Sequence, residues 1–263
     1  MGARDRVSTQ YKGGPTAPYN RALFSLGIAA SVPTVRDPPS PLIMKNPLSI
    51  AVALAAAAVV VPSAYAQDAQ AGAKKIAMCN GCHGIPGYQA SFPQVYKVPM
   101  IAGQSAKYIV SALNAYKKGD RKHPSMRGIA DSLSEQDMAD IAAYYEGLGG
   151  SVSLPETPAE QPPAQVAELL TKGACASCHG ANFSKPIDPT YPKIAGQHAD
   201  YLFVSLKEYK TEGNPRVGRA NAIMGGQVKQ FSVAELKLLA NYVGSLPSQL
   251  KTVRPNPFHP GAH

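Results

Sequence analysis

Apolar side chains recur three or four positions apart in four segments of this chain, a spacing typical of amphipathic α-helices. Two segments follow Gln104 and Gln197, and their apolar positions are Ile109, Leu113 and Tyr116, then Leu202, Leu206 and Tyr209. The other two follow Ser134 and Ser232, and their apolar positions are Met138, Ile141, Tyr145 and Leu148, then Leu236, Leu239, Val243 and Leu246. No segment alternates strongly with a period of two, so the pattern predicts an all-α protein.

Polar residues mark where the last helix of each set should begin. Ser134 is followed three residues later by Asp137, and Ser232 by Glu235. In such a capping box the Ser oxygen and the acidic side chain accept hydrogen bonds from backbone N–H groups that the helix start leaves without partners. A further helix should precede each cysteine motif, and in the second set its apolar residues are Val166, Leu169 and Leu170.

The longest apolar run, residues 48–61, indicates an export signal. It follows a Met-Lys pair and precedes Ala64-Tyr65-Ala66, which matches the small-x-small pattern of cleavage sites. Its 14 residues are fewer than the roughly 20 that span a bilayer. We therefore expect residues 44–66 to be a cleaved signal peptide, with an uncleaved anchor as the alternative. Residues 1–43 are then a non-structural extension, and Met44 is the expected true start.

The charge of the chain bears on its partners. The 263 residues carry a net charge of +9. Loss of residues 1–66 would remove six of the 26 Lys and Arg and two of the 17 Asp and Glu, which leaves +5. Because much of the basicity belongs to the leader and no Arg/Lys stripe is interleaved with aromatic residues, we expect no nucleic-acid partner.

The chain contains an internal repeat, which decides its domain organisation. The four cysteines form two C-x-x-C-H motifs, and each is followed by Ile-Ala-Gly-Gln, ending at Gln104 and at Gln197. A stretch with four prolines separates the copies and predicts an extended linker. The expected parts are domain 1 (residues 67–150), the linker (151–164), domain 2 (165–250) and a C-terminal tail (251–263).

A C-x-x-C-H motif is the attachment signature of a c-type haem, because its two thiols can form thioethers with the vinyl groups while the adjacent His binds the iron. The sequence therefore predicts two covalently bound haem c groups. The expected thioether residues are Cys79, Cys82, Cys175 and Cys178, and the expected proximal ligands are His83 and His179.

Two other uses of the cysteines stay open. A shared zinc site usually has about 15–20 residues between its cysteine pairs, whereas 92 residues separate Cys82 from Cys175. A redox-active disulfide usually belongs to a βαβ context, which the apolar pattern does not predict.

The sixth iron ligand decides between an electron carrier and an enzyme. Met126 and Met224 lie 43 and 45 residues after His83 and His179, each in a Gly-bounded loop segment before the last helix. Methionine raises the haem potential and leaves no open position for oxygen or peroxide. We therefore expect these two methionines as axial ligands of haems that transfer electrons.

Other candidates for this position are less consistent with the repeat. Met100 corresponds to Lys193 in the second copy. Met138 corresponds to Leu236 on the apolar face of a helix, so we expect it in the core. His123 has no counterpart in the repeat, and we expect it on the surface.

Tandem C-x-x-C-H domains, each with a following Ile-Ala-Gly-Gln, a Met-bearing segment and a capped final helix, resemble the dihaem cytochrome c4 family over nearly all of residues 67–250. The resemblance implies two class I cytochrome c domains, each wrapped around its haem, that pack about a pseudo-twofold axis. It implies electron transport in the periplasm from a bc1-type complex to a terminal oxidase. One departure is the spacing from Gln to Met, which is 22 residues in the first copy and 27 in the second.

Two alternatives to a free carrier remain: a dihaem electron-accepting subunit of a dehydrogenase, and a dihaem peroxidase. The sequence also leaves open a peripheral association with the membrane. Basic side chains near the two methionines would steer an acidic redox partner, or they form an ordinary solvated surface. These residues are Lys117, Lys118, Arg121, Lys122 and Arg127, then Lys210, Arg216 and Arg219.

Overall fold

The computed structural model describes residues 66–150, 152–158 and 160–254, which belong to one unit of the chain. The predicted N-terminal extension, nearly all of the predicted signal peptide and residues 255–263 of the predicted tail lie outside the described residues. Within the described ranges, every helix is too short or too polar to cross a membrane.

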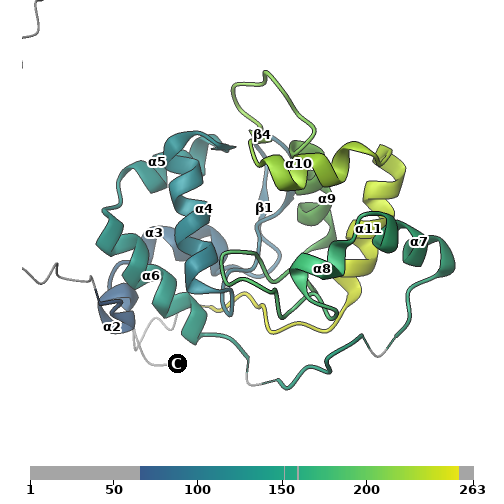
Figure 1. The fold of residues 1–263 in the computed structure, drawn as a ribbon. Coiled ribbons are helices and arrows are strands. Elements are labelled where there is room, and N and C mark those ends of the chain that lie inside the picture. The colour runs from purple at the N-terminus through teal and green to yellow at the C-terminus, as the bar shows by residue number, and fades with distance from the viewer. Residues whose placement is uncertain (1–65, 151, 159, 255–263) are drawn as a thin grey trace, which may run out of the picture. The chain divides into compact units, whose positions relative to one another are not determined.

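Both halves of the described chain are helical (Figure 1), so the all-α prediction is confirmed. The first half contains α2 (Ala69–Ala73), α3 (Ala77–His83), α4 (Ala106–Lys118), α5 (Pro124–Asp131) and α6 (Glu135–Gly147). The second half contains α7 (Ala164–Lys172), α8 (Cys175–His179), α9 (Ala199–Glu208), α10 (Ala222–Lys229) and α11 (Val233–Ser245). The described strands have two residues each: β1 (Gln89–Ala90), β2 (Tyr96–Lys97), β3 (Arg121–Lys122) and β4 (Gly218–Arg219).

The short strands form two antiparallel pairs. β1 pairs with β2 inside the first half. β3 pairs with β4 of the second half, with Arg121 opposite Arg219. This second pair joins the halves directly, just before α5 and α10.

Both predicted capping boxes are present. The Asp137 N–H donates to Ser134 Oγ, and the Ser134 N–H donates back to Asp137 Oδ2, each over 3.1 Å. At α11 the Glu235 N–H donates to Ser232 Oγ over 3.2 Å, and the Ser232 N–H donates to Glu235 Oε2 over 2.6 Å. Each cap contributes about 1 kcal/mol to helix stability, which fixes where α6 and α11 begin.

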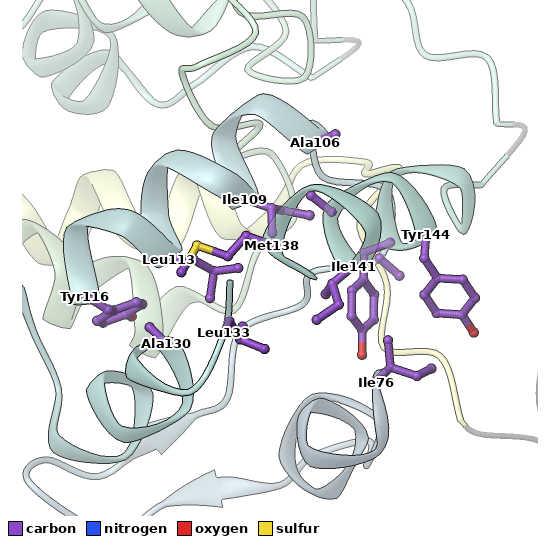
Figure 2. Close-up of a cluster of buried hydrophobic side chains, with 13 residues drawn as sticks. Ile76, Ala106, Ile109, Leu113, Tyr116, Ala130, Leu133, Met138, Ile141 and Tyr144 are labelled. Atoms are coloured by element: carbon purple, nitrogen blue, oxygen red, sulfur yellow. The ribbon is translucent and has the colours of Figure 1, made fainter. Parts of the chain in front are cut away.

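The core of the first half lies where α6 packs against α4 and α2. Figure 2 shows Met138 reaching from α6 toward Ile109 and Leu113 of α4. Met138 and its counterpart Leu236 in α11 are both fully buried. The prediction that Met138 packs in the core is therefore confirmed, and the burial of each such side chain contributes about 1.5–3 kcal/mol.

The segments outside the helices also pack. Asn182 Nδ2 donates to the carbonyl oxygen of Pro155 over 2.7 Å, which ties the linker to the second half. After α11 the chain returns to the first half, where the Lys251 N–H donates to the carbonyl oxygen of Ala102 over 3.1 Å. The two halves are thus connected by backbone hydrogen bonds in two separate places.

Candidate functional site

The first cysteine motif occupies α3 and presents a neutral histidine. Nδ1 of His83 lies 2.8 Å from the carbonyl oxygen of Pro99. A carbonyl oxygen only accepts hydrogen bonds, so Nδ1 carries the proton and Nε2 keeps a lone pair for a metal. Burial lowers the pKa of His83 and raises the pKa of the Cys79 thiol to about 11, so both side chains are uncharged at neutral pH.

The second motif, on α8, repeats this arrangement. Nδ1 of His179 lies 3.0 Å from the carbonyl oxygen of Pro192. The His179 residue is buried, and this burial lowers its pKa. Both histidines are therefore held in the tautomer that binds a metal through Nε2.

Met126 and Met224 lie on helices, so the prediction that they lie in loop segments is wrong. Each occupies the first turn of a short helix, Met126 in α5 and Met224 in α10. The glycines that suggested a loop, Gly128, Gly225 and Gly226, lie inside these helices. Side-chain caps at the N-termini of both helices offset part of their low helix propensity.

His123 provides one of these caps and is half-buried, so the prediction that it has no counterpart in the repeat is wrong. Its Nδ1 accepts a hydrogen bond from the Met126 N–H over 3.3 Å. In the second half, Asn221 Oδ1 accepts from the Met224 N–H over 2.9 Å. The two residues differ chemically but have the same role, which a comparison of residue types does not reveal.

The eight predicted site residues line one continuous cavity of about 860 Å³ with mainly apolar walls. They are Cys79, Cys82, His83, Met126, Cys175, Cys178, His179 and Met224. Among the described residues, no three Cys, His, Asp or Glu side chains gather into a site for a bare metal ion. The cavity wall also includes Arg121, whose buried Nε has no hydrogen-bond partner in the described part of the chain. Apolar walls and a buried cationic donor fit a group with a large apolar ring and carboxylate substituents, as haem has.

Arg121 and Arg219 lie between the halves, so the prediction that they belong to a basic surface is wrong. Arg121 is 9% exposed and donates through Nη2 to Tyr201 Oη over 2.5 Å and through Nη1 to Tyr108 Oη over 3.3 Å. The Arg219 side chain is 8% exposed, and its Nε donates to Glu208 Oε2 over 2.9 Å. The antiparallel pairing of β3 with β4 brings these two arginines together.

The pKa of Tyr201 reflects the positive charge of Arg121 and Arg219. Burial raises the pKa of Tyr201, but the guanidinium groups of Arg121 and Arg219 outweigh the burial and lower the pKa to about 8. Two buried cations next to the carboxylate of Glu208 make this region favourable for further anions. By contrast, Lys118, Arg127 and Arg216 are exposed and remain available to steer a partner.

Two glutamines that sequence reasoning treated only as repeat markers connect the halves. Gln104 forms hydrogen bonds with the backbone of Lys193, and Gln197 with the backbone of Met100. Both glutamines are buried. Their identical place in the two Ile-Ala-Gly-Gln sequences was the signal that could have revealed a shared role.

The comparisons with known proteins agree with the two-part organisation. The cytochrome c family matches residues 69–148 and 164–247. Cytochrome c4 of Stutzerimonas stutzeri is 33% identical over 198 residues, which cover 69% of this chain and 90% of that protein. The crystal structure of reduced recombinant cytochrome c4 from Pseudomonas stutzeri has a TM-score of 0.52 at 31% identity, and the match covers 69% of this chain and 100% of that chain.

The name of a further relative specifies a redox role. The thiosulfate dehydrogenase electron acceptor of Stutzerimonas stutzeri strain A1501 is 29% identical over 188 residues, which cover 67% of this chain and 83% of that protein. The cytochrome c4 relatives are electron-transfer proteins and not enzymes, and two tandem cytochrome c domains bind covalent haem c, which resolves the zinc and disulfide alternatives. The chain belongs to the cytochrome c family and, within it, to the dihaem cytochrome c4 proteins, which transfer electrons through two covalently bound haem c groups.

Proposed function

We propose that each half holds its haem through its own cysteine motif and its own methionine. The thioether residues are Cys79 and Cys82 in the first half and Cys175 and Cys178 in the second. The axial iron ligands are His83 with Met126, and His179 with Met224. The observation that carries this proposal is the pair of histidine–carbonyl hydrogen bonds, because each leaves Nε2 of a cavity-lining histidine free as a neutral ligand for a metal.

When bound, the haem iron supplies a reversible change of one electron. The side chains of this chain determine how that change proceeds. The apolar cavity wall would exclude water from a bound haem, and a histidine with a methionine would hold its iron in both oxidation states, so little of the chain would have to move on electron transfer. The side-chain caps at Met126 and Met224 fix the backbone of each methionine.

The protein is proposed to work in the periplasm and to carry electrons from a bc1-type complex to a terminal oxidase. Residues 44–66 act as the cleaved signal peptide, and residues 67–150 and 165–250 form the two haem domains. The matched ranges 69–148 and 164–247 support these boundaries. The exposed Lys118, Arg127 and Arg216 support an acidic redox partner.

A second candidate is an electron acceptor for a dehydrogenase. The similarity to a thiosulfate dehydrogenase electron acceptor favours it. Reduction rates separate the two functions: the purified protein is mixed either with a bc1-type complex and quinol or with a thiosulfate dehydrogenase and thiosulfate. Faster reduction by the bc1-type complex supports the proposal, and faster reduction by the dehydrogenase replaces it with the second candidate.

Ligation is tested on the mature holoprotein. A pyridine haemochrome assay should give two haems per chain, and the ferric protein should have the weak near-infrared band of iron bound to methionine sulfur. Met126→Leu and Met224→Leu should each remove about half of that band, because each removes one of two sulfur ligands. Met100→Leu, a change in the same cavity, should leave it intact. A full band after Met126→Leu, or a mass equal to that of the bare chain, would contradict the assignment.

A further inference from the structure

The two buried glutamines hold the backbone of the opposite half in the same way. Gln104 Nε2 donates to the Lys193 carbonyl oxygen over 2.9 Å, and the Lys193 N–H donates to Gln104 Oε1 over 3.0 Å. Gln197 Nε2 donates to the Met100 carbonyl oxygen over 2.8 Å, and the Met100 N–H donates to Gln197 Oε1 over 3.0 Å. Each side-chain amide thus satisfies both the donor and the acceptor of one residue of the other half.

The residue held by each glutamine directly follows the proline that orients a histidine. In the first half, Pro99 accepts the hydrogen bond from His83 Nδ1. In the second half, Pro192 accepts the hydrogen bond from His179 Nδ1. Each glutamine Oε1 therefore accepts from the N–H of the same peptide group whose carbonyl sets the angle and basicity of a histidine.

The positions of the glutamines are tightly constrained. Gly103 and Gly196, which precede them, have positive φ angles of 85° and 65°. A Cβ atom added at either glycine would lie 2.6 Å from a backbone carbonyl oxygen of the segment after α11, so only glycine fits there. Each glutamine Oε1 also accepts from the next N–H of its own half, Ser105 or His198, over 3.0 Å. The amide groups are fixed on both sides.

We infer that each glutamine is a positioning residue for the haem of the other half: Gln197 supports His83, and Gln104 supports His179. The inference rests on the proposed roles of the two histidines as iron ligands. A hydrogen bond from Nδ1 to a carbonyl raises the basicity of Nε2 and so stabilises ferric iron. Loss of the support should loosen that hydrogen bond and raise the reduction potential of the haem opposite to the altered glutamine.

The experiment measures each haem separately in the full mature holoprotein. Met126→His and Met224→His, made once in the unaltered protein, each lower one potential and so assign the two haems, because methionine raises the potential relative to histidine. Gln197→Leu should then raise the potential of the first haem, and Gln104→Leu that of the second. Mutation of a residue that orients a metal ligand commonly changes metal affinity or activity by about tenfold or more. A tenfold shift in a one-electron equilibrium corresponds to about 59 mV. Paramagnetic NMR should show the ring N–H of His83 moving in the first variant and that of His179 in the second.

Gln94→Leu is the matched control. Gln94 Nε2 also donates across the halves, to Glu208 Oε1 over 3.3 Å, but Glu208 is in neither of the segments whose carbonyls orient His83 and His179. This variant should leave both histidine N–H signals in place. If Gln197→Leu does not assemble, Gln197→Glu keeps an acceptor for the Met100 N–H, loses the donor, and should still move the His83 signal.

The inference fails if a glutamine variant alters the haem of its own half, alters both haems equally, or alters neither. The unaltered protein separates this failure from failure of the proposed function. If it lacks two haems with His/Met ligation, the ligand assignment is wrong. If it has both haems but the variants do not each alter the haem of the opposite half, only the inferred role of the two glutamines is wrong.

Discussion

Glu208→Gln tests the charge balance between the two halves. Glu208 is 5% exposed and accepts a hydrogen bond from Arg219 Nε over 2.9 Å. The amide side chain has nearly the same shape and can still accept this hydrogen bond, so the change removes charge and little packing. It leaves Arg219 without the carboxylate that pairs with it.

The size of the effect follows from burial. Removing one partner of a buried ion pair costs about 3–5 kcal/mol, because the other charge stays desolvated. For a unit of about 190 residues, each kcal/mol of unfolding free energy shifts the melting temperature by about 2–4 °C. Glu208→Gln should therefore lower the melting temperature of the holoprotein by about 6–20 °C.

The assay is thermal unfolding of the holoprotein followed by circular dichroism. Asp131→Asn is the control, because Asp131 pairs with Arg127 over 3.7 Å while both side chains are more than half exposed. An exposed pair of this kind is worth about 0–1 kcal/mol. If the two variants melt within a degree or two of each other, the buried pair between the halves does not stabilise the protein as we argue.

Three further outcomes are expected. Met138→Ala and Leu236→Ala should each lower the unfolding free energy by about 2–5 kcal/mol in denaturant titrations, because both side chains are fully buried; a loss below 1 kcal/mol would contradict the core assignment. Burial tends to raise the pKa of Asp140, but hydrogen bonds, with that from Lys75 first, outweigh it and lower the pKa. The contribution of Asp140 to the free energy of unfolding is then full above its unfolded pKa of about 3.9 and is lost as the pH falls through the lower folded value. Asp140→Asn should therefore flatten the acid side of a plot of unfolding free energy against pH. Arg127→Ala should weaken the salt dependence of electron transfer to an acidic partner, and an unchanged dependence would exclude Arg127 from steering.

Local patterns in the sequence were sufficient for the helices that follow Gln104, Ser134, Gln197 and Ser232 and for the chemistry of the cysteines, but not for α5 and α10. The apolar spacing before Tyr116 and the capping box at Ser134 involve residues within a few positions of one another, and such short-range physics acts in the same way in any fold. The two C-x-x-C-H motifs are also local, since Cys79 and His83 occupy a single short helix. The duplication itself was visible because the same offsets recur in both copies.

Only the tertiary structure decided which polar residues work together across the halves. Arg121 has the sequence context of a surface basic cluster, yet its partner Tyr201 lies 80 residues away. The hydrogen bonds of Gln104 reach Lys193, 89 residues away, and those of Gln197 reach Met100, 97 residues away. Burial and pairing of this kind depend on how the two halves pack, and a pattern that repeats every three or four residues contains no information about a contact between two separate helical sets.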